Sequence, residues 1–394
     1  MPPWSQCAEP GSFNTPEAII RTAIVHDYIT QLGGAERVAG LLARRYPDAS
    51  LFTSVHRQDL VPLEAVGGRV WRTSFLQWCV RRTGLKATLP LLPAAVASLP
   101  TAEYELLISS SSAFGHHASK GPGTLHVCLC HTPPRFLWQS NVYFRGRPAL
   151  KHALAPLLAV LRRLDRRAAR GVDAYVAVSK HVAARIHQTY GREAQLVYPP
   201  VNVASFAPVR ERSGRFLVVS RLVPSKRVEL VIEAANRSGL PLDVIGAGPE
   251  MASLSRLAGR SVRMLGWQPD PTVREAVARC EALVVAGEED FGLVMAEAQA
   301  SGRPPVAFAA GGALEIIEDG TTGYLFSEQT PASIADAMRR ARGSSVDVAS
   351  LVESARRFDL PLFFEHLESA IETARVQQTS GVAASEALVV EAGS

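Results

Sequence analysis

The sequence has no apolar run as long as the roughly 20 residues that a membrane-spanning helix needs. Its longest apolar stretches, residues 89–99 and 153–161, are shorter and contain proline. Residues 1–20 mix proline, glycine, serine and glutamate, and they have neither the basic start nor the apolar centre of a signal peptide. We therefore expect a cytoplasmic protein in which residues 1–20 form a loose N-terminal extension.

The sequence also contains few cysteines and carries little net charge. The five cysteines are an odd number without the paired spacing of a zinc site, so we expect reduced thiols. No Asp-x-Asp motif occurs, and the sequence predicts no metal site and no resident cofactor. The net charge of +5 is small for 394 residues, and no stretch interleaves basic and aromatic residues. We therefore expect no nucleic-acid partner.

Hydrophobic residues make up 47% of the chain, which is enough for two buried cores. Short apolar runs alternate with longer helical patterns, as in parallel sheets covered by helices on both faces. The alternation stops near residues 198–212, where three prolines occur, and then restarts. These features predict an α/β fold with two doubly wound domains, over residues 21–200 and 215–360. We also predict a linker over 201–214, a helix over 361–376 that returns to the first domain, and a disordered tail over 377–394.

The predicted strands of the first domain are residues 21–26, 106–109, 125–130 and 174–178. Those of the second domain are residues 215–220, 242–245, 263–265, 282–285 and 305–308. Ligands of open α/β sheets bind beyond the carboxyl ends of the strands. Residues that directly follow a strand are therefore the first candidates for a site.

The strongest pattern is GEEDFGLVMAEAQASGRPPVAFAAGGALEII, residues 287–317. It follows a predicted strand, begins with an acidic turn and continues into a helix. Free amides at a helix start, together with the positive end of the helix dipole, suit a diphosphate. The residues expected on the first turn are Phe291, Gly292 and Leu293.

Two glutamates accompany this helix. We place Glu289 at its start and Glu297 about two turns further along, where one carboxylate can hold sugar hydroxyls and the other a ribose. The alternative is that both are solvated helix acids and that Gly292 only fits a tight turn. The Gly311-Gly312 pair after the next strand offers a second close backbone approach, which favours a site.

Two further loops follow strands. Arg221 and Lys226 come after the first strand of the second domain and can neutralise a departing diphosphate; the alternative is that they are solvated loop cations. Gly33 and Gly34 precede a helix near the start of the first domain, where their amides can approach phosphate or sugar oxygens. A plain glycine turn explains this second pattern nearly as well.

His131 leaves a predicted strand within CHTPPRFLW, residues 130–138. Its place at a strand end makes it a catalytic candidate, although a lone histidine is more often a packed or hydrogen-bonded residue. The GAG at residues 246–248 also follows a strand. Met251 occupies its third glycine position, so it is a weak dinucleotide signal.

Together these segments resemble glycosyltransferase family 4, retaining enzymes with the GT-B fold, over residues 21–375. The Glu-x7-Glu element of the family, its diphosphate-site cations and its glycine loop match Glu289 and Glu297, Arg221 and Lys226, and Gly33 and Gly34. The runs HDYITQLGGAERV, CHTPPRFLW and EEDFGLVMAEAQASGRP are similar to bacterial mannosyltransferases that extend lipid-linked O-antigen or exopolysaccharide repeats.

The resemblance implies two facing Rossmann-like domains with an interdomain cleft, and a nucleotide-sugar donor bound mainly by the C-terminal domain. It implies GDP-mannose as donor, a lipid-linked or glycan acceptor, no metal, and Glu289 and His131 as catalytic residues. In the relatives the histidine that matches His131 lies beside the transferred sugar. Val294 and Met295 replace the proline that usually follows FGL, and Gln299 stands where methionine is common, so the shape of the sugar pocket can differ.

Other functions fit the same architecture. A UDP- or ADP-sugar transferase, a sugar-nucleotide epimerase, a phosphorylase, a dinucleotide oxidoreductase and a carbohydrate-binding protein are the alternatives. Two segments, residues 145–170 and 74–86, mix cations with apolar residues. They predict peripheral contact with the anionic cytoplasmic membrane face, or else amphipathic helices with a solvated basic edge.

Overall fold

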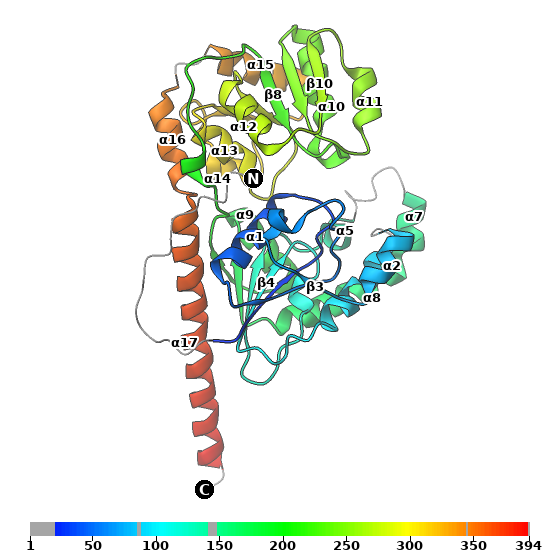
Figure 1. The fold of residues 1–394 in the computed structure, drawn as a ribbon, viewed down its shortest axis with the longest axis vertical. Coiled ribbons are helices and arrows are strands. Elements are labelled where there is room, and N and C mark those ends of the chain that lie inside the picture. The colour runs from blue at the N-terminus through cyan, green and yellow to red at the C-terminus, as the bar shows by residue number, and fades with distance from the viewer. Residues whose placement is uncertain (1–19, 85–87, 141–147, 344–345, 393–394) are drawn as a thin grey trace. The chain divides into compact units, whose positions relative to one another are not determined.

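The computed structural model describes residues 20–84, 88–140, 148–343 and 346–392. The chain forms two compact units (Figure 1). The N-terminal unit runs to Val197 and resumes at Glu365, and the C-terminal unit comprises Tyr198–Phe364. The predicted N-terminal extension, residues 1–20, lies outside the described residues except for its last member.

The N-terminal unit is built on a seven-stranded sheet with the order β3-β2-β1-β4-β5-β6-β7. All its adjacent strand pairs are parallel. The strands are β1 (Thr22–His26), β2 (Ser50–Thr53), β3 (Arg72–Thr73), β4 (Leu106–Ser111), β5 (Leu125–Cys130), β6 (Ala174–Ala177) and β7 (Ala194–Leu196). The helices are α1 (Gly34–Arg45), η2 (Leu63–Val66), α2 (Leu76–Thr83), η3 (Leu89–Leu91), α4 (Leu92–Ala97), η4 (Gly115–His117), α5 (Arg135–Trp138), α7 (Pro148–Ala153), α8 (Ala155–Arg170) and α9 (Lys180–Tyr190).

The C-terminal unit contains a six-stranded parallel sheet with the order β10-β9-β8-β11-β12-β13. Its strands are β8 (Phe216–Val219), β9 (Leu242–Ile245), β10 (Val262–Gly266), β11 (Leu283–Val285), β12 (Pro305–Phe308) and β13 (Tyr324–Phe326). Its helices are η5 (Val203–Ser205), η6 (Pro224–Lys226), α10 (Val228–Ser238), α11 (Met251–Leu257), α12 (Asp270–Arg279), α13 (Leu293–Ala300), α14 (Ala313–Ile316), α15 (Pro331–Arg342) and α16 (Val348–Arg356).

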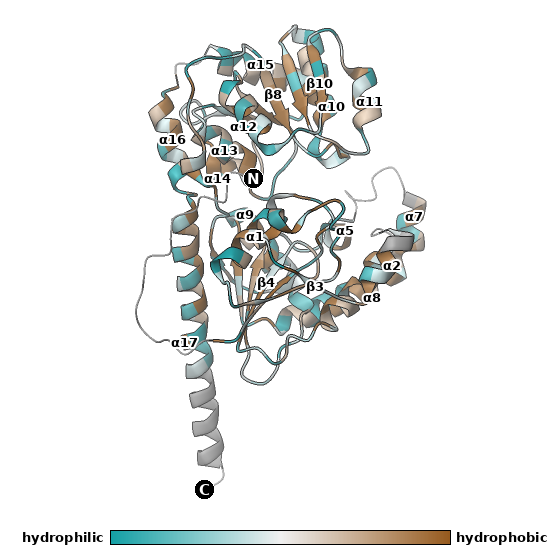
Figure 2. Cartoon of the chain, viewed as in Figure 1, coloured by the Kyte–Doolittle hydropathy of each residue, from teal (hydrophilic) through white to brown (hydrophobic). Residues whose placement is uncertain are grey.

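The central strands of both sheets are buried on both faces, which explains why they are apolar runs. Phe216 and Val218 of β8 belong to one apolar cluster, and Leu217 between them belongs to a second cluster on the other face. Figure 2 shows β4 and β8 as predominantly hydrophobic strands. The two parallel sheets confirm the predicted pair of doubly wound α/β domains of the GT-B fold.

Each sheet has a point at which the order of its strands reverses. In the C-terminal unit β8 lies between β9 and β11, and in the N-terminal unit β1 lies between β2 and β4. Open α/β sheets bind their ligands beyond the strand ends at such a point. The loops after β8 and β11, and those after β1 and β4, are therefore the places to look for a site.

The last helix, α17, extends over Leu360–Ala392. From Glu365 onward it belongs to the N-terminal unit, where Glu368 pairs with Arg45 at 2.8 Å. A helix thus occupies residues 377–392, for which composition predicts a disordered tail. The segment is rich in alanine and contains no proline, and its single glycine costs a helix only about 1 kcal/mol relative to alanine.

Candidate active site

The acidic turn of the strongest motif lies between β11 and α13. The helix begins at Leu293, and Gly292 is its N-cap residue with a φ of 97°. This left-handed conformation favours glycine, and a Cβ at Gly292 would lie 2.2 Å from Met295 Cε. The first amides of a helix have no partner within it, so those of Leu293 and Val294 can donate to an anion.

The predicted start of this helix is therefore too early, because Phe291 precedes the N-cap residue. The Phe291 side chain is only 4% exposed. Its ring centroid lies 5.7 Å from that of Tyr198 and 5.1 Å from that of Phe358. Phe291 thus anchors the acidic turn to the core, and it can meet a ligand only through its backbone.

Lys226 and Glu289 form a direct ion pair at the strand-order reversal of this sheet. Lys226 ends η6 after β8, Glu289 follows β11, and Lys226 Nζ lies 2.6 Å from both carboxylate oxygens. Their side chains are 22% and 15% exposed, so the pair is partly shielded from water. The next residue, Arg227, has a left-handed φ of 55°, a conformation that costs about 1–2 kcal/mol outside glycine. Strain of this kind is common where a loop is held for function.

The glycine pair after β12 supports the acidic turn. The Gly312 amide donates to the Glu289 carbonyl at 2.9 Å, and Gly311 forms an isolated parallel bridge with Glu289. A Cβ on Gly312 would lie 2.3 Å from the Phe291 carbonyl oxygen. The close approach predicted for this pair is thus an approach to the backbone of the acidic turn, which it holds in place.

The other predicted residues of the C-terminal unit lie on the same loops and helix. Arg221 is exposed just beyond the end of β8, and Glu297 is the fifth residue of α13, partly buried. Glu297 is therefore about one turn from the helix start, not two. The structure brings Lys226 and Glu289 into contact. Arg221 lies in the loop between β8 and η6, which ends at Lys226, and Glu297 lies on α13, which follows the turn that holds Glu289.

The glycine loop of the N-terminal unit, Gly33 and Gly34, forms the start of helix α1. Gly33 is the N-cap residue of α1, and its amide donates to Glu36 Oε2 at 2.9 Å. Gly34 is exposed as the first residue of the helix. The Gly33 amide is therefore already bound, contrary to the expectation that it is free for a ligand. A glutamate three residues after an N-cap position is a known capping pattern that could have predicted this.

His131 follows β5 and is partly buried. Its Nε2 lies 2.9 Å from Ser110 Oγ, and Ser110 Oγ lies 3.1 Å from His26 Nδ1. Burial, together with the nearby His26, lowers the pKa of His131 to about 3. The imidazole is thus neutral at physiological pH, where it can donate or accept a hydrogen bond.

Sequence reasoning missed Asp27, which organises the loop after β4. Its buried carboxylate accepts the amides of Ala113 and Phe114 at 2.8 and 2.7 Å, and also those of Ser112 and Gly115. Charge-assisted hydrogen bonds of this kind are stronger than neutral ones. The position of Asp27 one residue after a buried strand is the signal that could have identified it.

A second buried carboxylate belongs to a cluster of potential metal ligands. Within the described part of the chain, His116, His117 and Asp165 bring three ligand atoms within 4.8 Å of one another. Asp165 Oδ2 accepts Trp138 Nε1 at 2.7 Å and Tyr190 Oη at 2.8 Å, and Oδ1 accepts His117 Nε2 at 3.2 Å. His116 Nε2 lies 3.0 Å from the same Oδ1. Hydrogen bonds therefore satisfy this carboxylate, which joins η4, α5, α8 and α9.

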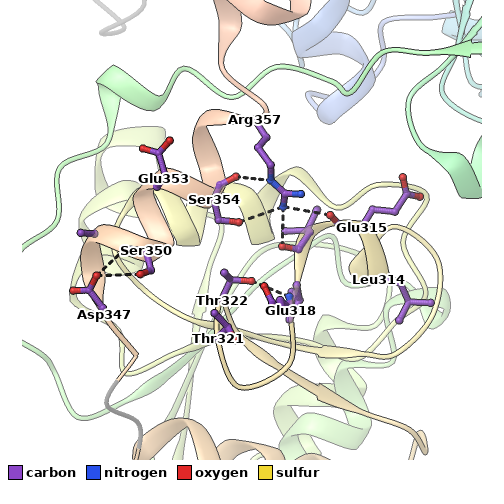
Figure 3. A pocket seen from close by; sticks show the side chains of 13 residues that line it. Leu314, Glu315, Glu318, Thr321, Thr322, Asp347, Ser350, Glu353, Ser354 and Arg357 are labelled. Atoms are coloured by element: carbon purple, nitrogen blue, oxygen red, sulfur yellow. Dashed lines mark hydrogen bonds between the residues drawn. The ribbon is translucent and has the colours of Figure 1, made fainter.

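A surface pocket of about 1030 Å³ lies on the C-terminal unit, between residues 314–322 and α16. Figure 3 shows the side chains that line it. There the Arg357 guanidinium donates to the carbonyls of Ser354, Glu315 and Ile316. Neither Lys226 nor Glu289 lines this pocket. The candidate site therefore rests on the strand ends and not on this cavity.

Comparisons with known proteins match both units to glycosyltransferase families. Residues 32–205 match the family described as Glycosyltransferase Family 4, and residues 205–358 match Glycosyl transferases group 1. The chain is 30% identical over 203 residues to an exopolysaccharide phosphotransferase of Streptomyces coelicolor, covering 48% of this chain and 21% of the relative. It is 30% identical over 185 residues to D-inositol 3-phosphate glycosyltransferase of a Nocardioides species, covering 37% and 40%. The chain thus spans less than half the length of these curated relatives.

Among solved structures, HepE of Anabaena in complex with UDP and glucose has a TM-score of 0.68 to this chain at 19% identity. The likeness covers 90% of this chain and 100% of that one. At this identity it shows the shared two-sheet fold.

Proposed function

Because the chain belongs to the glycosyltransferases of group 1 and family 4, we propose that it is a retaining hexosyltransferase that moves mannose from GDP-mannose to a lipid-linked or glycan acceptor in cell-surface polysaccharide synthesis. The observation that carries the proposal is the contact of Lys226 with Glu289 beside the start of α13. It places a cation, a carboxylate and helix amides at the position where open α/β sheets bind ligands.

These groups suit the breaking of a sugar-phosphate bond. The bond between C1 of the sugar and the diphosphate oxygen breaks, and Lys226, Arg221 and the first amides of α13 stabilise the departing charge. The Glu289 carboxylate stabilises the oxocarbenium-like sugar. The acceptor oxygen then bonds to C1 on the face that the diphosphate leaves, and the acceptor proton passes to a departing phosphate oxygen. No metal is required for these steps.

The guanosine assignment rests on the resemblance of CHTPPRFLW and EEDFGLVMAEAQASGRP to mannosyltransferases. Trp267 follows β10 and is 73% exposed, so its ring can stack on a nucleobase. UDP-glucose is the second candidate donor, because the similar structure of HepE is a complex with UDP and glucose.

A transfer assay separates the two donors. The protein is incubated with a membrane lipid extract and radiolabelled GDP-mannose or UDP-glucose, and label in the lipid fraction is counted. We expect label from GDP-mannose. Label in the lipid fraction from UDP-glucose alone selects UDP-glucose as the donor. If neither sugar is transferred to any acceptor, the result contradicts the proposed function.

We also propose that the N-terminal unit contacts anionic membrane through α2 and α8. Residues of the two helices share one core cluster, and the helices lie side by side (Figure 1). Their outer faces expose Trp78, Leu157, Val160 and Leu164. The described part of the chain contains no helix long and apolar enough to cross a membrane. Residues 85–86 and 145–147 of the two predicted basic segments lie outside the described residues.

Charge reversal on α8 tests this contact. Arg163 and Arg167 are exposed beside the apolar residues, and a basic side chain near anionic lipid contributes about 1 kcal/mol. We expect the wild-type protein to sediment with phosphatidylglycerol vesicles at low salt and to be released at high salt. Arg163→Glu with Arg167→Glu is expected to weaken binding at least tenfold. Arg256→Glu with Arg260→Glu, at exposed positions of the C-terminal unit, is the control; equal loss in both variants, or no binding at low salt, contradicts the contact.

A further inference from the structure

Three strand-end residues of the N-terminal unit form a continuous hydrogen-bonded chain. His26 ends β1 and is paired in register with Ser110 of β4, and His131 follows the neighbouring strand β5. Ser110 Oγ lies 3.1 Å from His26 Nδ1 and 2.9 Å from His131 Nε2. His26 and Ser110 are buried, and the His131 amide is fixed to the Ser111 carbonyl at 2.7 Å. The backbone and one ring nitrogen of His131 are thus held by the sheet.

A serine hydroxyl has a single hydrogen and can donate it to only one of the two imidazoles. The tautomers of His26 and His131 therefore depend on each other. If Ser110 donates to His26, His131 must donate from Nε2, and its Nδ1 is then an acceptor. If Ser110 donates to His131, His26 must donate from Nδ1, and Nδ1 of His131 then carries a hydrogen. The remaining nitrogen of His131 can therefore change from acceptor to donor without a change in net charge.

A neutral His131 ring is the state that this environment favours. The pKa of His131 is lowered to about 3 by burial and by the neighbouring His26, so a second proton on the His131 ring is disfavoured. His131 therefore serves as a neutral hydrogen-bonding group and not as an acid or base near pH 7.

We propose that Ser110 and His26 are positioning residues that hold the His131 imidazole and set whether its Nδ1 donates to or accepts from a hydroxyl of the transferred hexose. This inference rests on the proposed function and on the family resemblance, which implies that His131 lies beside that sugar. It adds two buried residues, neither of which touches the substrate, to the requirements of the reaction.

The neighbouring serine provides a matched control. Ser109 precedes Ser110 on β4, is equally buried, and its Oγ lies 2.8 Å from His126 Nε2. Successive side chains of a strand point to opposite faces, so Ser109→Ala removes a similar buried serine-histidine bond on the other side of the sheet. Both alanine variants are expected to lose similar stability. Any difference between them in sugar transfer then reflects the chain to His131.

Steady-state transfer and nitrogen NMR of the histidine rings test the proposal. We expect Ser110→Ala to lower kcat/KM for the donor sugar about tenfold or more, chiefly through kcat, with Ser109→Ala within twofold of wild type. Ser110→Thr, which keeps the hydroxyl, is expected to recover most of the loss. The His131 ring nitrogens are expected to show neutral tautomers whose ratio changes in Ser110→Ala. If Ser110→Ala does not fold, His26→Phe replaces it, because it keeps a ring against Trp71 but removes Nδ1.

The variant His131→Asn separates the positioning role of Ser110 and His26 from the role of His131 in the proposed function. Loss of transfer in His131→Asn with full transfer in Ser110→Ala and His26→Phe overturns the positioning role alone. Full transfer in His131→Asn overturns the assignment of His131 in the proposed function, and the positioning role with it. Equal losses in Ser110→Ala and Ser109→Ala also overturn the positioning role, since they reveal a structural effect only.

Discussion

Replacing Glu289 with glutamine is expected to lower the turnover number for sugar transfer by about a hundredfold or more. The amide has nearly the same size, but it lacks the charge that stabilises an oxocarbenium-like sugar. It also releases Lys226, whose ammonium lies 2.6 Å from both Glu289 oxygens. The KM for the donor is therefore expected to stay unchanged or to fall, because the diphosphate no longer competes with Glu289 for Lys226.

The adjacent acid is the control for this substitution. Glu288 is exposed, and Glu288→Gln makes the same chemical change one residue away. We expect its steady-state kinetics to be close to those of the wild type. A folded Glu289→Gln protein with near wild-type turnover, or equal losses in both variants, would show that the Glu289 carboxylate has no special role in transfer.

Gly312→Ala is expected to give the second large effect, a loss of about 2–4 kcal/mol in the free energy of unfolding. The new Cβ would lie 2.3 Å from the carbonyl oxygen and 2.4 Å from the Cα of Phe291. Both are backbone atoms of the acidic turn, so the strain cannot be relieved by rotating a side chain. Urea denaturation measures the loss, and donor affinity is expected to weaken with it because Glu289 shares this turn.

Gly343 at the end of α15 is the matched position for Gly312. It has a φ of −82°, and a Cβ there would lie 3.7 Å from its nearest neighbour, the Arg339 carbonyl oxygen. Gly343→Ala is therefore expected to leave stability within about 0.5 kcal/mol of the wild type. A Gly312→Ala protein as stable as Gly343→Ala would contradict the close packing of the acidic turn.

The partly exposed edge strand β10 is among the predicted strands, whereas the largely buried strand β2 is not. The central strands β1, β5 and β8 are buried apolar runs, which is the pattern that sequence predicts best. Thus β8 and β5 were found close to their observed bounds. The strands β3 and β7 lie at the sheet edges, and β7 is only partly buried with the sequence AQL. A short edge strand has no apolar run and no strict alternation, so it escapes a search by pattern.

The sequence predicts which loops carry the candidate site, but it does not predict which of their residues are in contact. Lys226 and Glu289 each follow a predicted strand, which made both candidates, yet they are 63 residues apart and only the order of the strands brings them together. His26 and Ser110 are 84 residues apart and look like ordinary strand-end residues. Their link to His131 depends on the pairing of β1, β4 and β5, which the sequence alone did not supply.

The central claim is that Lys226 and the acidic turn bind the diphosphate of a nucleotide sugar, and a melting scan tests it most directly. GDP, UDP, ADP and dTDP are compared at equal concentration with chelator present, on wild type, Lys226→Met and, as control, Lys180→Met at an exposed position of the N-terminal unit.

A ligand at a hundred times its Kd stabilises the folded state by about 2.7 kcal/mol, and each kcal/mol raises the Tm of a domain of this size by about 2–4 °C. We predict a rise of several degrees for wild type and Lys180→Met, largest with GDP, and little rise for Lys226→Met. A larger shift with UDP would overturn the guanosine assignment alone. Equal shifts in wild type and Lys226→Met, or no shift with any diphosphate, would contradict the donor site itself.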